Sequence, residues 1–400
     1  MRPLLFILVL APALAGCEQK AFMTEKAPPL STTIGPPATP PAPLENTPPP
    51  APVPVRKKPP VYRPGWAPPA VLDTALVLNG QPYRLHVRAE TDSTERLKTT
   101  YQPYAGHFEQ ARGYQGRFTF TLHDGSGRQV FRRQLRKTDF FKSAGGDIVT
   151  ESEALLPELL AYSAPFGALV FTLDFMVPDS DVGSQVVLLL DLTGRVLRLS
   201  DGRGPGSGPD CDPALTTDGR ALLTGSELLR PHQPPLRLTK PDADLAGAFL
   251  LSDTTLLVVY APGKSHLIQS PGAPETYGRT PTQQQLRAPN AYVRHTHNGR
   301  VLSRFRYGGF YEELGYTIPR HYLHGTATHY LLDEQRGLRL VPLAKANLPT
   351  EVRFAAMRPY TPPRKPAEVR FELQSSGSGF AFYVDTTSQV PRIRYQRLEY

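Results

Sequence analysis

Three histidines in the C-terminal half have the residue type and spacing of a metal site. His295 and His297 are two positions apart, so on a strand they share one face, and His321 follows in a loop-rich stretch. Catalytic zinc sites use three protein ligands and keep a fourth position for water. These histidines are therefore candidate metal ligands. The alternative is that they are ordinary hydrogen-bonded residues of a surface rich in tyrosine and arginine.

Tyrosines concentrate in the same part of the chain. Tyr307, Tyr311 and Tyr316 are candidate ligand-binding residues, since an aromatic ring with a polar end can stack on a sugar or a peptide. In a β-rich protein most such rings pack in the core. We expect a glycan or peptide surface if two of them are exposed together, and simple packing otherwise.

The remaining chemical motifs are incomplete. Asp179 and Asp181 stand two apart in a turn, but a calcium loop also needs a third oxygen ligand and a distal Glu in register. In Gly263-Lys264-Ser265 the first glycine of a phosphate-binding loop would have to stand where Val258 is. The glycine-rich segment 202–208 has no following helix to present its dipole to a phosphate. We therefore expect no cofactor and no recognisable catalytic residues.

Cys17 closes the sequence Leu14-Ala15-Gly16-Cys17 after a short apolar run. Arg2 precedes roughly ten apolar residues, as in a signal peptide, and the run is shorter than the about 20 residues of a membrane span. This ending resembles the lipobox of bacterial lipoproteins. The resemblance implies cleavage after residue 16, a lipid on the Cys17 thiol and attachment to a membrane. An ordinary cleaved secretory signal is the alternative.

The lipobox resemblance also implies a location. Glu18 follows the cysteine, whereas an Asp there resembles an inner-membrane retention signal, so we expect an extracytoplasmic protein anchored in the outer membrane of a bacterium. The second cysteine, Cys211, then has no partner within the chain. The fold must stand without a disulfide, and Cys211 is expected to be buried, because a free cysteine behaves as a small apolar residue.

The net charge of +9 does not indicate a nucleic-acid partner. Residues 1–69 carry seven basic and three acidic side chains, so only +5 falls on residues 70–400, without the clustered basic face that nucleic-acid binding needs. One dense basic stretch remains. It is expected to form a solvated strand face, with contact to a phosphate-bearing envelope glycolipid as the alternative, and its members are Arg128, Arg132, Arg133, Arg136 and Lys137.

The segment 17–69 is predicted to be a spacer. It holds 17 of the 44 prolines between Ala27 and Pro69 and almost no large apolar residues, so it cannot bury a core. Proline favours extended polyproline II backbone. The segment would hold a folded body away from the lipid surface.

The body, residues 70–400, reads as all-β. Asn79-Gly80 between two alternating runs predicts a hairpin, and Gly116–Asp124 alternates like a half-buried strand. Within Leu155–Val177, a short helix is expected before a buried strand at Leu169–Phe175. Turns ending in glycine recur between strand pairs, and these glycines are Gly127, Gly194, Gly219, Gly299 and Gly337.

Cys211–Thr224 resembles the strand-turn-strand units of β-propellers. The glycine separations show no single period, and the Trp-Asp signature of the best-known repeats is absent. The resemblance implies a propeller-like body over residues 181–400. A separate, β-sandwich-like domain is predicted to precede it at residues 70–180.

These features predict a lipid-anchored cell-envelope protein whose β body binds a protein, peptide or glycan without catalysis. The first alternative is a hydrolase or lyase that acts on envelope or other polysaccharide with a site built from loops. A concave pocket holding two carboxylates within about 5–10 Å of each other would favour that alternative, and a flat or aromatic-lined face would favour binding. A further alternative is a structural factor in envelope assembly.

Overall fold

The computed structural model describes residues 66–104, 107–202, 208–268, 276–312, 315–387 and 392–398. The chain divides into two units, Met1–Pro60 and Val61–Tyr400, and every described residue belongs to the second. Cys17, the signal segment 1–16 and the spacer up to residue 65 lie outside the described residues, so the lipobox and the spacer stay predictions.

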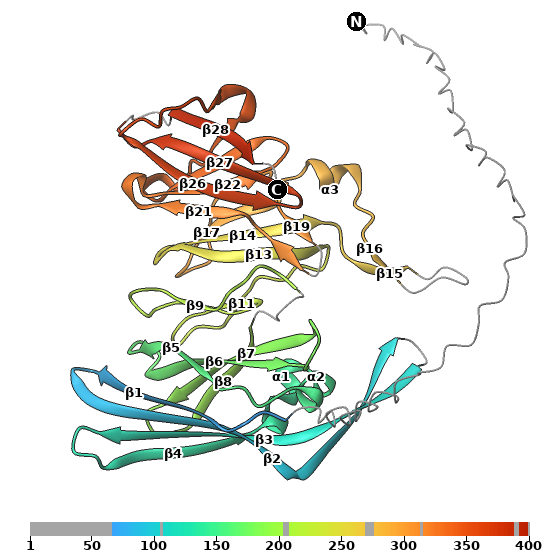
Figure 1. The fold of residues 1–400 in the computed structure, drawn as a ribbon, viewed down its shortest axis with the longest axis vertical. Coiled ribbons are helices and arrows are strands. Elements are labelled where there is room, and N and C mark those ends of the chain that lie inside the picture. Colours follow the sequence, from blue (N-terminus) through green and yellow to red (C-terminus); the bar gives the residue numbers. More distant parts are fainter. Residues whose placement is uncertain are drawn as a thin grey trace, which may run out of the picture. The chain divides into compact units, whose positions relative to one another are not determined.

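The all-β prediction is confirmed, because strands dominate the body (Figure 1). Within the described residues they form six four-stranded sheets, numbered in chain order, and two short hairpins. The first sheet contains β1 (Ala70–Leu78), β2 (Gln81–Tyr104), β3 (His107–Asp124) and β4 (Gln129–Arg136). The second contains β5 (Glu158–Ser163), β6 (Ala168–Met176), β7 (Gly183–Asp191) and β8 (Val196–Asp201). The third contains β9 (Ala214–Leu215), β10 (Leu222–Leu223), β11 (Glu227–Leu229) and β12 (Leu236–Arg237).

The C-terminal half continues the same plan. The fourth sheet contains β13 (Ala243–Ser252), β14 (Thr255–Pro262), β17 (Ala291–His295) and β18 (Val301–Phe305). The fifth contains β21 (Arg320–Leu323), β22 (Thr328–Asp333), β23 (Gly337–Pro342) and β24 (Thr350–Arg353). The sixth contains β25 (Arg358–Pro359), β26 (Glu368–Ser375), β27 (Ser378–Asp385) and β28 (Arg392–Leu398). The hairpins are β15 (His266–Ile268) with β16 (Thr276–Gly278), and β19 (Tyr311–Glu312) with β20 (Tyr316–Thr317).

Helices are short. α1 (Phe141–Ala144) and α2 (Gly146–Glu151) follow the first sheet, and α3 (Gln283–Arg287) precedes β17. Single 3₁₀ turns are η1 (Lys137–Phe140), η2 (His324–Thr326), η3 (Leu343–Lys345) and η4 (Phe354–Ala356). In the part of the chain that the structure describes, no helix has the length and apolar character needed to cross a membrane.

Each sheet shares a hydrophobic cluster with the next sheet along the chain. Five such clusters join the first sheet to the second, the second to the third, and so on to the sixth. Neighbouring residues of one strand enter opposite clusters: Leu222 packs toward the second sheet and Leu223 toward the fourth. The strands of inner sheets are therefore apolar on both faces.

The first, second, third and fifth sheets are antiparallel meanders of consecutive strands, whereas in the sixth sheet β25 pairs in parallel with β28. Four-stranded meanders are also the units of β-propellers, and closure into a propeller stays a prediction. The predicted domain limit at residue 180 falls in the turn between β6 and β7. Those two strands pair over their full length, from Ala168 with Asp191 to Met176 with Gly183.

Local turn predictions are confirmed, and one helix prediction is wrong. Asn79 and Gly80 both have positive φ, 50° and 76°, as a tight two-residue hairpin turn requires. All five recurrent turn glycines also have positive φ. The segment expected to begin with a short helix instead forms β5, which pairs with β6. The hydrogen bonds and side-chain packing that this segment gains by pairing with β6 outweigh its weak intrinsic preference for a helix.

Candidate functional site

The structure brings together two of the three candidate metal ligands. His295 ends β17, and its Nδ1 accepts a hydrogen bond from the backbone N–H of His297 at 3.2 Å. The two rings lie 5.5 Å apart between centroids. The two rings are close because His297 lies in the turn that joins β17 to β18.

His321 packs elsewhere. It stacks on Phe371 of the sixth sheet, with ring centroids 4.3 Å apart, and burial together with His324 lowers its pKa. Among the residues that the structure describes, no group of three or more His, Cys, Asp or Glu side chains is placed to hold a metal ion. The structure therefore gives no support to a zinc site of His295, His297 and His321.

The candidate tyrosines are mainly core residues. Tyr307 and Tyr316 are buried in the cluster between the fourth and fifth sheets. The Tyr307 hydroxyl donates to the carbonyl of Leu332 at 2.7 Å and contacts that of Gly309 at 2.9 Å, and burial raises its pKa well above the usual value. Tyr311 is half-buried on β19. Tyr307 and Tyr316 are therefore core packing residues, and Tyr316 also borders a cavity.

A cavity of about 970 Å³ is lined by chain segments of three sheets and two hairpins. Its lining includes the end of β8, the β10–β11 turn, the start of β13, the segment after β14, the end of β16 and β20. The polar side chains among them are Asp201, Ser226, Thr239, Asp244, Lys264, Ser265, Arg279 and Tyr316. The strands position these groups because each residue stands at or just beyond a strand end.

Asp244 is the centre of a hydrogen-bonded group in this cavity. Its Oδ1 lies 3.0 Å from the Lys264 Nζ, and its Oδ2 accepts hydrogen bonds from the backbone N–H of Ser265, at 2.9 Å, and from the Ser265 hydroxyl. Burial acts to raise the pKa of Asp244, but the hydrogen bonds from Ser265 and Lys264 outweigh it and hold the pKa below its usual range. Asp244 is therefore an ionised, 14 % exposed acceptor, whereas the Lys264 side chain stays 56 % exposed.

Arg279 and Tyr316 form the other polar part of the lining. The guanidinium carbon of Arg279 lies 5.3 Å from the centre of the Tyr316 ring, within the range of a cation–π contact. The backbone N–H of Tyr316 donates to the carbonyl of Gly208 at 2.9 Å. The β19–β20 hairpin is thereby tied to the segment that follows the second sheet.

Gly225 allows the second and third sheets to meet beside the cavity. Its N–H donates to the carbonyl of Asp201 at 2.9 Å, and a Cβ at this position would overlap the carbonyl of Gly202. Any larger residue at 225 would push these two segments apart.

The lining favours binding of a polar molecule over covalent chemistry. Two cationic and two anionic side chains balance each other, and four hydroxyl groups add donors and acceptors. The Ser265 hydroxyl donates to a carboxylate, and none of the described lining residues is a histidine that could act as its base. The cavity does hold two carboxylates, Asp201 and Asp244.

Sequence reasoning missed this cavity, although a signal was present. Gly225-Ser226, Gly263-Lys264-Ser265, Gly278-Arg279 and Gly315-Tyr316 are all a glycine followed by a polar residue at a strand end. In the sequence, Gly263-Lys264-Ser265 resembles only an incomplete phosphate-binding loop. Cys211 is buried as predicted, and burial raises the pKa of its thiol.

No protein-family model and no curated protein matches this sequence.

Proposed function

We propose that this protein is a lipid-anchored cell-envelope protein that binds a peptide or glycan, without catalysis, in the cavity lined by Lys264, Arg279 and Tyr316. The observation that carries the proposal is the cavity itself. Its volume of about 970 Å³ is large enough for a short peptide or oligosaccharide, and its polar groups come from five separate β units.

The charges of the lining favour a neutral or zwitterionic ligand. Asp244 neutralises Lys264 within 3.0 Å, while Arg279 and the Tyr316 ring offer a cation beside an aromatic face. Peptides and neutral sugars present hydroxyl, amide and carbonyl groups that suit such a mixture of donors and acceptors.

Ligand binding by Lys264 and Arg279 can be measured by titration calorimetry with a panel of peptides and oligosaccharides. A lost hydrogen bond to a charged group weakens binding about tenfold or more, so we expect that loss from Lys264→Ala and from Arg279→Ala. Lys345→Ala removes an exposed lysine outside the cavity lining and is the matched control. A ligand that binds all three variants equally well is bound elsewhere and contradicts the proposal.

A polysaccharide hydrolase or lyase remains the second candidate, because Asp201 and Asp244 line one cavity. Asp244 is held ionised by its donors, so Asp201 would have to supply the acid. The check is release of reducing ends from envelope polysaccharides by the parent chain, by Asp201→Asn and by the control Asp179→Asn. Turnover that only Asp201→Asn abolishes would replace the binding proposal with this one.

The anchor part of the proposal is supported by the lipobox sequence at Cys17. Cys17→Ser should release the protein from the membrane fraction of cells. Unchanged membrane retention of that variant would contradict lipid attachment at this residue.

A further inference from the structure

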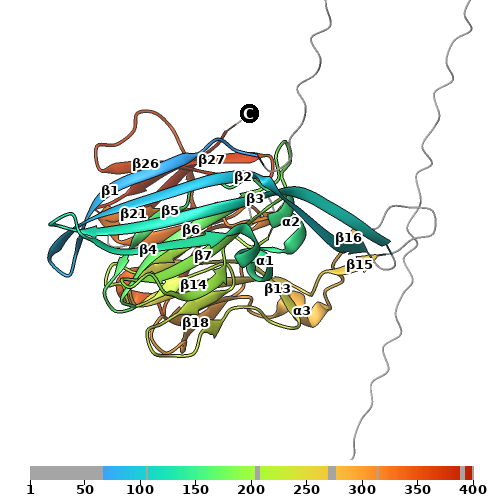
Figure 2. The same ribbon diagram turned by 90° about the horizontal axis from the view of Figure 1, so that it is seen from below.

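The first sheet carries a two-stranded arm. β1 pairs with β2 only up to Ala89, and β4 pairs with β3 only from Arg117 onward. Residues 96–104 of β2 and 107–114 of β3 continue as a hairpin of two strands beyond both neighbours (Figures 1 and 2). We call these residues the β2–β3 arm.

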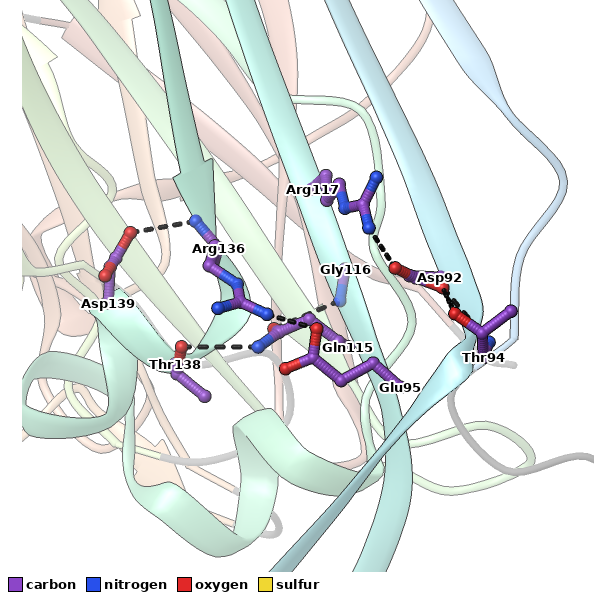
Figure 3. Close-up of polar contacts among 9 residues, drawn as sticks. All are labelled: Asp92, Thr94, Glu95, Gln115, Gly116, Arg117, Arg136, Thr138 and Asp139. Carbon is purple, nitrogen blue, oxygen red and sulfur yellow. Dashed lines mark hydrogen bonds and ion pairs between the residues drawn. The ribbon is translucent and has the colours of Figure 1, made fainter.

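A polar cluster holds the bend where the arm begins. Three residues of β2, 93–95, have no partner between the pairs Asp92 with Gln115 and Arg96 with Tyr114. Figure 3 shows that Asp92 is joined to Arg117 and that Glu95 is joined to Arg136 of β4. Hydrogen bonds from Thr94 lower the pKa of Asp92. The bulge is thus fastened to the sheet.

The inner face of the arm is fixed on α2. The Thr99 and Thr150 hydroxyls lie 2.7 Å apart, and Gly113 leaves no room for a side chain against the Thr150 carbonyl. Lys137, which the sequence placed on a solvated face, is wholly buried here. Its Nζ donates to the carbonyls of Tyr114, at 3.0 Å, Thr150, at 3.2 Å, and Ser152, at 2.6 Å. The base of the arm is therefore preorganised.

The outer face of the arm is basic. Lys98 stands directly opposite Arg112, and Arg96 shares their face because it is two positions before Lys98. All three are exposed, and none forms an ion pair with a described residue. The carboxylate of Glu109 lies on the inner face, 2.8 Å from the Tyr101 hydroxyl.

Two features of this face call for an anionic, partly apolar partner. Like charges directly opposite each other destabilise a strand pair, so an anion between Lys98 and Arg112 would relieve their repulsion. Phe108, on the same side of β3 as Arg112, is 67 % exposed near the end of the arm. Cations beside an exposed aromatic ring match the phosphates and the acyl boundary of a lipid surface.

We infer that the β2–β3 arm docks through Arg96, Lys98, Arg112 and Phe108 onto an anionic phospholipid surface. The face is a projecting ribbon, and no arm residue lines any of the described cavities, which favours a planar partner over an enclosed peptide. This inference rests on the proposed function only for the location of the protein at a membrane, and it does not involve the ligand cavity.

The test uses the full chain with Cys17→Ser, so that no lipid anchor contributes. Sedimentation with phosphatidylcholine vesicles containing about 30 % phosphatidylglycerol should capture the protein, pure phosphatidylcholine should not, and capture should fall as salt rises from about 50 to about 500 mM. Each basic residue near an anionic surface contributes about fivefold, so Lys98→Glu with Arg112→Glu should weaken capture roughly 25-fold or more. Phe108→Ser should weaken it severalfold.

The matched control is Arg304→Glu with Arg306→Glu, two exposed arginines of the fourth sheet and the segment after it, which changes the net charge equally but lies off the arm. Equal loss from both double variants would show a net-charge effect only and overturn the inference. Failure of the parent to bind these vesicles, or binding of soluble polyglutamate with the same variant pattern and no vesicle capture, would also overturn it. A failed anchor at Cys17 would leave these results unchanged, because the anchor is absent from the assay.

Discussion

The fourth sheet and the first sheet share a four-stranded plan but differ in how many faces are covered. In β14 every residue from Thr255 to Ala261 is buried. Leu256 enters the cluster with the third sheet, and Leu257 enters the cluster with the fifth. In β1 exposed and partly buried residues alternate instead, up to the buried Leu78. A sheet between two neighbours must be apolar on both faces, whereas the first sheet needs only one apolar face.

This difference decides where charged side chains can act. The outer face of the first sheet carries ion pairs such as Arg84 with Asp73, and it extends into the basic arm. Among the inner sheets a buried carboxylate is paired with hydrogen-bond donors. Asp210, for example, accepts from the Ile318 N–H at 2.8 Å and pairs with Arg320.

The largest expected effect contrasts these two ion pairs. Asp210→Asn leaves the guanidinium of Arg320 without its buried counter-charge, so we expect a loss of about 3–5 kcal/mol in the free energy of unfolding. Asp73→Asn breaks an exposed pair, and we expect no measurable change. Urea denaturation measures both. Similar losses from the two variants would mean that the first sheet is covered in solution.

Apolar truncation sharpens the same comparison. Leu257→Ala empties a site covered on both sides and should cost about 2–5 kcal/mol. Val71→Ala, on the uncovered face of β1, should change stability by less than about 0.5 kcal/mol. Guanidinium unfolding of the two variants is the measurement, and a large loss from Val71→Ala would show that this face is packed.

A third contrast concerns Lys137, the buried lysine at the base of the arm among the described residues. Burial, opposed by the charge of Glu153, lowers its pKa from the ordinary 10.5 to about 7. Between these values the unfolded chain binds more protons than the folded one, so stability should rise with pH from about 7 to 10.5. Unfolding of the parent is compared with Lys137→Met across this range, and the rise should be missing in Lys137→Met. Parallel pH profiles would mean that Lys137 keeps its proton in the folded state.

Much of the fold was predictable because strands and turns have local signals. The Asn79-Gly80 hairpin, the strand at Leu169–Phe175 and the buried Cys211 follow from alternation, turn chemistry and side-chain polarity. The prediction of a helix near Leu155 was wrong. This segment forms β5 because it pairs with β6, and the residues of β5 alone carry no signal of that pairing. The burial of Lys137 was missed for the same reason, as its three acceptors come from β3 and from the segment around α2.

The candidate sites also differ in whether local sequence spacing could predict them. His295 and His297 are neighbours, but His297 lies in the turn after β17 and not on the strand face that the spacing predicted. His321 is stacked on the sixth sheet. The ligand cavity joins residues as far apart as Asp201 and Tyr316, and no local pattern relates them.

The strand-rich class of the body and the position of its turns follow from the amino-acid sequence alone, and the resemblance of Leu14–Cys17 to a lipobox predicts an anchor. Period-two alternation and positive-φ glycines act over a few residues, so they can be read locally. The packed fold is needed to tell which sheet faces are covered, which lysine is buried and which strand ends surround the cavity. Those outcomes depend on how successive sheets are packed, and packing joins residues that are distant in the chain.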